Sequence, residues 1–325
     1  MNDTTKEQIG QWKQINEDLS SIVSFEKFND TFDKTVCLFD TLGDNAMRQP
    51  IINIIGNKNY ILCADFFLAT IQTLKSITAC CKLGNFSDAN VLTRKFRDDL
   101  FQYLYIMAAT DNIKGLTKEE LAQYFNNGMT EEGFLNAVAD LYSILASGIR
   151  KESRDKGIDA WFDNTLNNSC SKEYRYNFFK TSAYIEFINK NTLVKFCFDA
   201  YLKEQWEALS RRQNNFTHSN GRNFLSANTI SIWDKKRAIA MLDQVMDDIS
   251  LTTAFFLSVL ILIKPSYISS SDYVDCLDCG LEPTEGSQYW VAPIVQDYID
   301  EFVTKIHSGL KTYLTKNNPY GMEIK

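Results

Sequence analysis

The distribution of proline is the feature of this sequence that most restricts its fold. Of five prolines, one is Pro50 and four lie at position 265 or later, so residues 51–264 contain none. Proline removes a backbone donor and clashes with the preceding helical turn, so its absence leaves this stretch free to form long helices. Apolar residues recur there at helical spacing, and the alternation typical of half-buried strands is not sustained. We therefore expect an all-α protein, a multi-helix bundle.

Capping residues, glycines and apolar periodicity divide the chain into a succession of helices. The expected helices cover residues 4–22, 25–42, 44–55, 59–83, 87–109, a short helix opened by Thr117, 130–153, 157–189 as one or two helices, 191–218, 229–263 and 294–315. Residues 269–290, which break the helical pattern with serines and glycines, should form a structured loop. No repeat or flexible linker interrupts the chain. We expect a single all-α domain over residues 1–325, with a core at about 59–263 and a C-terminal loop and helix at 265–325.

Two of these helices, 191–218 and 229–263, are the longest in the second half of the chain. They should pack against the pair that lies between residues 59 and 109, because all four segments are amphipathic or apolar and are joined by short turns.

Charge and hydropathy restrict the partners and the compartment. The net charge of −7 makes the chain a poor non-specific binder of nucleic acid, which requires clustered Lys and Arg, although a small basic site remains available. The N-terminal residues are polar, which indicates no signal peptide, and the eight cysteines are scattered. We expect a cytoplasmic protein with mostly buried free thiols. The longest apolar run, residues 249–263, is too short for a bilayer span and predicts a buried core helix rather than a membrane anchor.

A histidine at the end of a long expected helix is the leading candidate for chemistry. The chain has two histidines, and one of them, His218, follows the polar residues Arg211, Arg212, Asn214 and Asn215. Histidine titrates near neutral pH and arginine is a permanent cation, so the two together suit acid–base catalysis beside a phosphate. A helical wheel places Arg211, Asn215 and His218 on one stripe, which indicates a helix that begins in the core and ends at a cleft. The alternative is an ordinary helix end, where arginines favour the dipole and solvate the surface.

A second helix carries charged residues on a face that also holds aromatic rings. Arg94, Asp98, Phe101 and Tyr105 lie opposite its apolar stripe and are flanked by Arg97. A solvated face rarely holds two aromatic rings beside an i,i+4 Arg–Asp pair, so this face should pack and the pair should be at least partly buried. Buried charges need partners. The pair is either a structural ion pair or a support for the His218 region.

The run from Arg212 to His218, Arg-Gln-Asn-Asn-Phe-Thr-His at a helix end in an all-helical chain, resembles the HEPN superfamily. The signature of that superfamily is an arginine, often followed by a polar residue, with a histidine four to six residues further on. Arg212 matches the arginine, His218 the histidine, and Asn214 the asparagine that many members place four residues before the histidine. The residue after Arg212 is Gln213 rather than Asn or Asp. The helical wheel favours Arg211 as the residue that faces His218, so both arginines remain candidates.

The resemblance implies an HEPN-like core and metal-independent cleavage of RNA. A ribose 2′-hydroxyl would attack the adjacent phosphate, with His218 as general acid and base and the arginine stabilising the extra negative charge of the transition state. No cofactor is implied. The implied role is that of a toxin or phage-defence effector, with an antitoxin or another regulatory protein as a further partner. The alternative is a non-catalytic helical protein that binds a partner or ligand through the same cleft.

The resemblance also implies a symmetric homodimer, because HEPN-type sites often form where two Arg–His motifs face one groove and this chain shows one motif. Phe101 and Tyr105 extend apolar character onto a second helix face, and aromatic residues recur between positions 174 and 184. Aromatic residues are enriched at interfaces, which is consistent with a dimer. The alternative is that the chain buries these rings in its own core.

Two other groups of residues have the spacing of metal ligands, but neither group is complete. Cys276 and Cys279 would form half of a zinc site, and no second Cys-x-x-Cys follows them. Asp243, Asp247 and Asp248 could bind Mg²⁺, but no second acidic helix motif accompanies them. The chain has no P-loop, dinucleotide fingerprint, nucleophile elbow or His-Glu-x-x-His motif. We therefore expect no metal and no cofactor.

Overall fold

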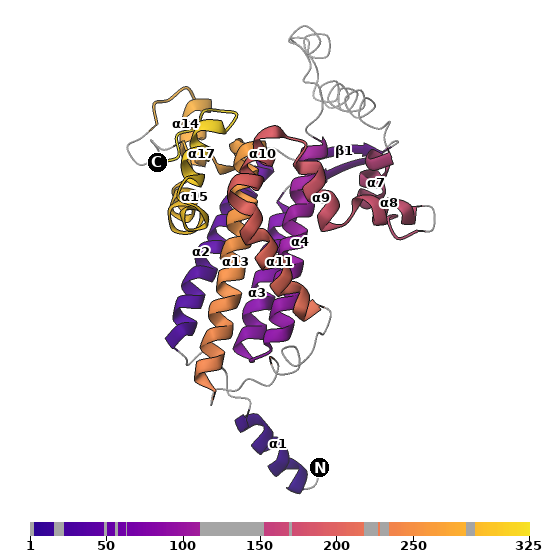
Figure 1. The fold of residues 1–325 in the computed structure, drawn as a ribbon, viewed down its shortest axis with the longest axis vertical. Coiled ribbons are helices and arrows are strands. Elements are labelled where there is room, and N and C mark those ends of the chain that lie inside the picture. Colours follow the sequence, from indigo (N-terminus) through magenta and orange to yellow (C-terminus); the bar gives the residue numbers. More distant parts are fainter. Residues whose placement is uncertain are drawn as a thin grey trace. The chain divides into compact units, whose positions relative to one another are not determined.

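The computed structural model describes residues 3–15, 23–48, 51–55, 58–62, 64–110, 153–168, 171–217, 227, 234–283 and 290–325. The chain divides into two compact units: unit 1 comprises residues 1–45, 65–100 and 191–325, and unit 2 comprises residues 46–64 and 101–190. The described parts of both units are predominantly helical (Figure 1), which confirms the all-α class and the multi-helix bundle. The single domain and its HEPN-like core stay predictions. The helices expected to open at Thr117 and Thr130 lie outside the described residues.

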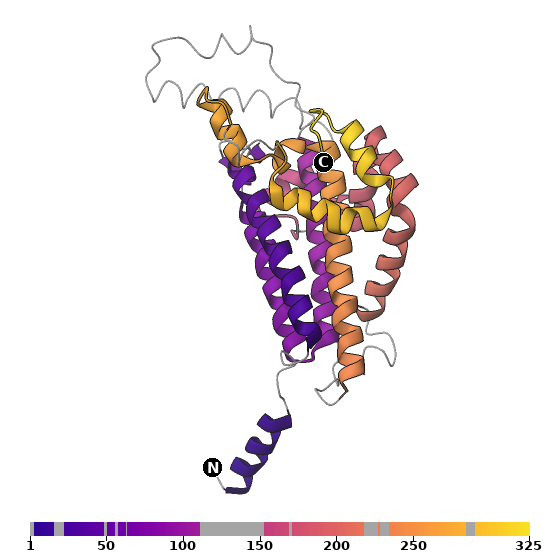
Figure 2. The same cartoon turned by 90° about the vertical axis from the view of Figure 1, so that its left-hand side faces the viewer.

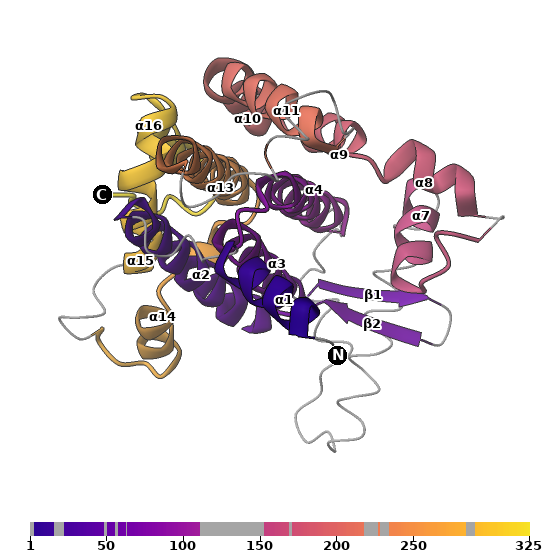
Figure 3. The same ribbon diagram turned by 90° about the horizontal axis from the view of Figure 1, so that it is seen from below.

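Unit 1 is a bundle of long helices. The element α1 (Asp3–Ile15) is followed by α2 (Val23–Arg48), α3 (Asp65–Lys82), the first part of α4 (Phe86–Thr110), α11 (Lys203–Thr217) and α13 (Lys235–Ile263). Figures 1 and 3 show α2, α3, α4 and α13 side by side, with α11 on the outside of α13 and α4. Gly84 makes the turn between α3 and α4 with a φ of 74°, a conformation that glycine adopts without a clashing Cβ. The expected end of this helix at Gly84 is therefore confirmed.

Four phenylalanine rings, one from each of these four helices, meet at the centre of the bundle. The ring centroid of Phe39 in α2 lies 6.0 Å from that of Phe67 in α3, 5.7 Å from Phe96 in α4 and 5.9 Å from Phe256 in α13. All four side chains are buried. Rings at these separations add a geometry-dependent attraction to the hydrophobic stabilisation of their burial. The expected packing of α13 against the helices between residues 59 and 109 is confirmed here.

The second half of α13 is buried around its whole circumference. Every residue from 252 to 262 is buried, so this part of the helix has no solvent-exposed face. The Ser258 hydroxyl is satisfied within the helix, because it donates to the carbonyl of Ala254 at 2.7 Å. Among the described helices, α13 is the one long and apolar enough to cross a bilayer, and most of its apolar window is enclosed by protein. The expectation that residues 249–263 form a buried core helix is confirmed.

Short helices follow α13 and complete unit 1. They are the 3₁₀ turn η4 (Pro265–Ile268), α14 (Ser271–Asp278), α15 (Pro293–Tyr298), the π-helical turn η6 (Ile299–Val303), α16 (Thr304–Ile306) and α17 (Leu310–Asn317). The segment from α15 to α16 lies across α13 (Figure 2). Two expectations are corrected here, since α14 occupies part of the expected loop 269–290 and the expected helix 294–315 is broken. The break occurs because His307 adopts an extended backbone, with φ −159° and ψ 133°.

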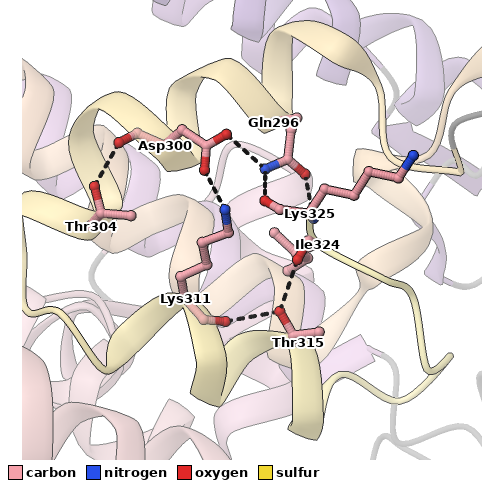
Figure 4. Close-up of polar contacts among 7 residues, drawn as sticks. All are labelled: Gln296, Asp300, Thr304, Lys311, Thr315, Ile324 and Lys325. Atoms are coloured by element: carbon pink, nitrogen blue, oxygen red, sulfur yellow. Dashed lines mark hydrogen bonds and ion pairs between the residues drawn. The ribbon is translucent and has the colours of Figure 1, made fainter.

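Side-chain amides and hydroxyls tie the last residues of the chain to α15 and α17 (Figure 4). The side-chain amide of Gln296 donates to the carbonyl of Lys325 at 2.5 Å and accepts from the backbone amide of Lys325 at 2.9 Å. It thus makes the two hydrogen bonds that a backbone amide of a neighbouring strand would make. The Thr315 hydroxyl lies 3.3 Å from the carbonyl of Ile324, to which it donates. Because Met322 and Ile324 are buried, these residues belong to the packed core of unit 1.

Unit 2 contains an antiparallel hairpin that helical periodicity did not predict. In it, β1 (Ile51–Ile55) pairs with β2 (Lys58–Leu62). The helices expected at 44–55 and 59–83 are therefore wrong over these residues, because α2 ends at Arg48 and α3 begins at Asp65. Short apolar runs rich in isoleucine fit a strand as well as a buried helix, so periodicity alone does not distinguish the two. Pro50, which disfavours a continuing helix, is the local signal that does.

The helices of unit 2 pack around buried aromatic rings. They are the last part of α4, α7 (Ser153–Phe162), α8 (Lys172–Phe178) and α9 (Thr181–Ile188). The ring centroid of Tyr105 in α4 lies 5.1 Å from that of Tyr184 and 5.3 Å from that of Phe187, both in α9. Phe101 and Tyr105 are only 2% and 1% exposed, so burial within the chain accounts for them. These two rings therefore give no support to a homodimer interface, and the expectation based on them is corrected.

Replacing Phe39 with alanine should lower the free energy of unfolding by about 3–5 kcal/mol, because the change opens a cavity among three other buried rings. Urea denaturation followed by circular dichroism measures the effect. Leu68→Ala on α3 is the matched control: its side chain is 53% exposed, so the change should stay within about 0.5 kcal/mol. Equal effects of the two substitutions would contradict the central position of Phe39.

Candidate functional site

The end of α11 places the residues of the Arg–His motif on different sides of the helix. Arg211, Asn214 and Asn215 are exposed, Arg212 is half-buried and Gln213 is completely buried. His218 follows the last residue of α11 and lies outside the described residues. The catalytic roles of His218, Arg212 and Asn214 therefore stay predictions.

A π-helical turn explains why the stripe expected along this helix is not the buried one. The helix α10 (Thr192–Cys197) continues through the π-helical turn η3 (Phe198–Leu202) into α11. A π turn holds one extra residue, which rotates every later side chain by about 100° relative to an unbroken α-helix. The buried residues of this segment are Val194, Cys197, Leu202, Trp206, Leu209, Gln213 and Phe216. Arg212 rather than Arg211 thus lies beside the buried face.

Arg212 forms an ion pair with Asp248 of α13. Its Nε donates to Asp248 Oδ1 at 2.9 Å, and its Nη2 donates to the same oxygen. The Asp248 side chain is 0% exposed and the Arg212 side chain is 35% exposed. The second oxygen, Asp248 Oδ2, is buried and has no hydrogen-bond partner among the described residues. The pair therefore connects a solvent-accessible guanidinium to a carboxylate enclosed by the bundle.

Burial raises the pKa of Asp248 from 3.8 to about 6, although the hydrogen bond and the charge of Arg212 favour the ionised form. Because the folded-state pKa lies above the unfolded one, the protonated carboxyl is the form that the fold tolerates better. The contribution of this group to stability is complete below about pH 4 and is lost as the pH rises through about 6. At neutral pH the ionised Asp248 consequently depends on Arg212 for compensation.

A second arginine, Arg97 of α4, is buried against α11. Arg97 is 3% exposed, and its guanidinium carbon lies 5.2 Å from the centroid of the Trp206 ring. Its Nε and Nη2 donate to Asp98 Oδ1 at 3.0 and 2.7 Å, and its Nη1 donates to the Ser210 hydroxyl at 3.2 Å. The cation–π contact and the hydrogen bond join α4 to α11, which confirms the expected packing of these two helices.

The expected pairing of Arg94 with Asp98 is also confirmed. Arg94 Nε lies 3.5 Å from Asp98 Oδ2, and the two side chains are 25% and 30% exposed. The sequence placed Arg97 only at the flank of this pair, whereas the structure gives it the most buried position of the three. The sequence signal for this position is that Arg97 directly follows the apolar Phe96 and directly precedes the acidic Asp98.

These contacts form a polar layer between α4, α11 and α13, which we call the arginine layer. It consists of Arg94, Arg97, Asp98, Ser210, Arg212 and Asp248. With Asp248 ionised, three guanidinium groups and two carboxylates leave one formal positive charge. Guanidinium groups bind phosphate and carboxylate through charge-assisted hydrogen bonds, so the exposed side of this layer suits an anion.

The acidic and cysteine residues with metal-like spacing do not converge. Asp248 is directed to Arg212, whereas Asp247 on the same helix is exposed. Cys276 is half-buried and Cys279 is exposed. Over the described ranges, no group of three or more His, Cys, Asp or Glu side chains gathers in a way that could hold a metal ion.

The expectation of mostly buried thiols is wrong for the six cysteines that the structure describes. Cys81 and Cys197 are buried, and burial raises the pKa of the Cys197 thiol to about 12. The other four are half-buried or exposed. All six are free thiols, and their apolar sequence surroundings did not reveal which face of each helix they occupy.

Comparison of the chain with protein families, with curated proteins and with solved structures gives no match. The Arg–His motif and the arginine layer are therefore the features of the chain that bear on its function.

Replacing Arg212 with glutamine should lower the free energy of unfolding by about 3 kcal/mol at neutral pH, because it leaves a buried carboxylate uncompensated. The penalty should shrink as the pH falls toward 6, since the variant can protonate Asp248. Urea denaturation at two pH values measures both effects. The double variant Arg212→Gln, Asp248→Asn should recover most of the loss, and Arg211→Gln, at an exposed position, is the matched control. An additive double variant would show that the two residues do not interact.

Proposed function

We propose that the protein is an HEPN-like, metal-independent ribonuclease that acts on cytoplasmic RNA as a toxin or phage-defence effector. The observation that carries the proposal is the way in which Asp248 holds Arg212. The pair uses Nε and Nη2 of the guanidinium, and Nη1 has no hydrogen-bond partner among the described residues. A guanidinium fixed by a buried carboxylate needs little reorganisation to receive a phosphate oxygen, which supports a transition-state role.

The proposed reaction needs only groups that the motif supplies. His218 removes the proton of a ribose 2′-hydroxyl, the 2′-oxygen bonds to the adjacent phosphorus, and the bond to the 5′-oxygen breaks as that oxygen takes up a proton. Arg212 stabilises the charge on the phosphorane-like transition state. The exposed amides of Asn214 and Asn215 orient the RNA. The products are a 2′,3′-cyclic phosphate and a 5′-hydroxyl.

A non-catalytic binding protein is the second candidate, and one observation favours it. Asp248 already compensates the charge of Arg212, which leaves less charge for a phosphate and fits an arginine that serves the fold. In this case the exposed Arg211, Asn214 and Asn215 would contact a partner or ligand, and His218 would not need to titrate.

Replacing His218 with alanine should reduce RNA cleavage by about 10²–10⁴-fold, the usual contribution of a general acid or base. The assay incubates purified protein with mixed RNA in the presence of EDTA and maps the product ends, which should carry 2′,3′-cyclic phosphates. The matched control is His307→Ala, which removes the other histidine of the chain and should keep full activity.

Cleavage that is equal in wild-type protein and His218→Ala, or absent under all conditions, would leave the binding protein as the surviving candidate. Arg212→Lys keeps a cation beside Asp248, so it tests the forked geometry of arginine without leaving the carboxylate uncompensated. Its stability should be measured alongside its activity, because Arg212 also supports the fold.

We further propose a symmetric homodimer, in which two motifs face one groove and supply one histidine for each proton transfer, with an antitoxin or other regulatory protein as a further partner. Sedimentation equilibrium at micromolar concentration should then give twice the chain mass of 37.3 kDa. A strict monomer would contradict the shared groove, and residual ribonuclease activity in that monomer would place the whole reaction within one chain.

A further inference from the structure

An open cavity of about 680 Å³ lies within unit 2, a size typical of small-molecule sites. Aromatic rings of Trp161, Phe162 and Phe179 line it. The rings of Trp161 and Phe162 meet edge to face with their centroids 4.9 Å apart, and both are only half-buried. The cavity therefore has an aromatic wall, in which Trp161 and Phe162 keep part of their surface exposed.

The backbone of α7 approaches α8 closely and turns sharply beside the cavity. Gly157 lets α8 approach closely, because a Cβ at this position would lie 3.1 Å from the Cβ of Tyr174. At the other end of α7, Asn164 adopts a φ of 56° and the amide of Thr165 donates to the carbonyl of Ala160 at 2.8 Å. This is the left-handed helix end that asparagine tolerates. The turn places Asn164 in the lining of the cavity.

The polar lining combines one cation with several amides. Arg175 of α8 is exposed, its Nη1 donates to Asn167 Oδ1 at 2.7 Å, and the described residues place no carboxylate within ion-pair distance of it. Gln102, Asn164 and Asn167 add side-chain amides, which can both donate and accept. Arginine stays fully charged whatever its partner. Because the Asn167 amide is neutral, it does not compensate the charge of Arg175, and an anion is the ligand that would do so.

We propose that this cavity binds a mononucleotide unit. The base stacks on the aromatic wall, the amides pair with its edge, and the phosphate binds Arg175. A free nucleotide and one nucleotide of an RNA strand share this chemistry. The proposal is independent of the ribonuclease proposal, because the lining residues that the structure describes all belong to unit 2 and Arg212 belongs to unit 1.

Titration of the full chain with AMP, GMP, CMP and UMP, followed by tryptophan fluorescence, tests this proposal. Stacking on Trp161 should quench part of the emission, and Trp161→Phe should remove that part while calorimetry still detects binding. Arg175→Gln should weaken the binding of the tightest-binding nucleotide at least tenfold. The matched control is Lys172→Gln, which removes an exposed cation of the same helix outside the cavity lining and should bind as the wild type does.

The corresponding nucleoside should bind at least tenfold more weakly than the nucleotide and should not respond to Arg175→Gln. A short single-stranded RNA that binds more tightly than the nucleotide, with the same dependence on Arg175, identifies an RNA strand as the source, and equal or weaker binding identifies the free nucleotide. Absence of saturable binding, or unchanged affinity in a folded Arg175→Gln variant, overturns the proposal. His218→Ala should leave nucleotide binding unchanged, because His218 belongs only to the ribonuclease proposal. Failure of the ribonuclease proposal can therefore be distinguished from failure of the nucleotide-binding proposal.

Discussion

The burial of α13 is the constraint on which the structure of unit 1 depends. This 29-residue helix contributes Phe256 to the central aromatic cluster and is enclosed on all sides over residues 252–262. A helix in that position cannot leave a polar group without a partner, except at a cost of a few kcal/mol. Asp248 lies just before the enclosed stretch, and its carboxylate is buried as well. The position of α11 is therefore coupled to α13 by the need to bring Arg212 to that carboxylate.

The same coupling gives a physical reason for the π-helical turn between α10 and α11. Without the extra residue, the face that buries Trp206, Leu209 and Gln213 would rotate away from α4 and α13. A buried ion pair is weak support for stability, because apolar residues of similar volume often serve as well. Its retention here fits a role in setting the register of α11, in presenting Arg212 to an anion, or in both. Arg212 is thus a structural residue. Its proposed chemistry depends on Nη1, the guanidinium nitrogen that Asp248 does not contact.

The arginines discussed above have different partners in the two units. In unit 1, Arg97 and Arg212 are each paired with a carboxylate, and Arg97 is also stacked on Trp206. In unit 2, Arg175 has an amide as its partner and lines an open aromatic cavity. The net charge of −7 disfavours general attraction of nucleic acid, so local sites of this kind are where an anion would gain binding energy. The chain therefore combines a net negative charge with two local sites at which we propose that phosphate binds.

The sequence by itself determined the helical class, the end of α3 at Gly84, the buried character of residues 249–263 and the pairing of Arg94 with Asp98. Each of these depends on contacts or periodicities within a few residues, which is the range that local patterns describe. Only the tertiary structure decided that β1 and β2 form a hairpin, that the π turn shifts the faces of α11, and that Phe101 and Tyr105 are core residues. It also decided that Arg212 meets Asp248 across a separation of 36 residues. A helical wheel assumes an unbroken helical period and contains no information on neighbouring helices. The partner of a buried charge depends on how helices pack, so it could not be predicted from local sequence.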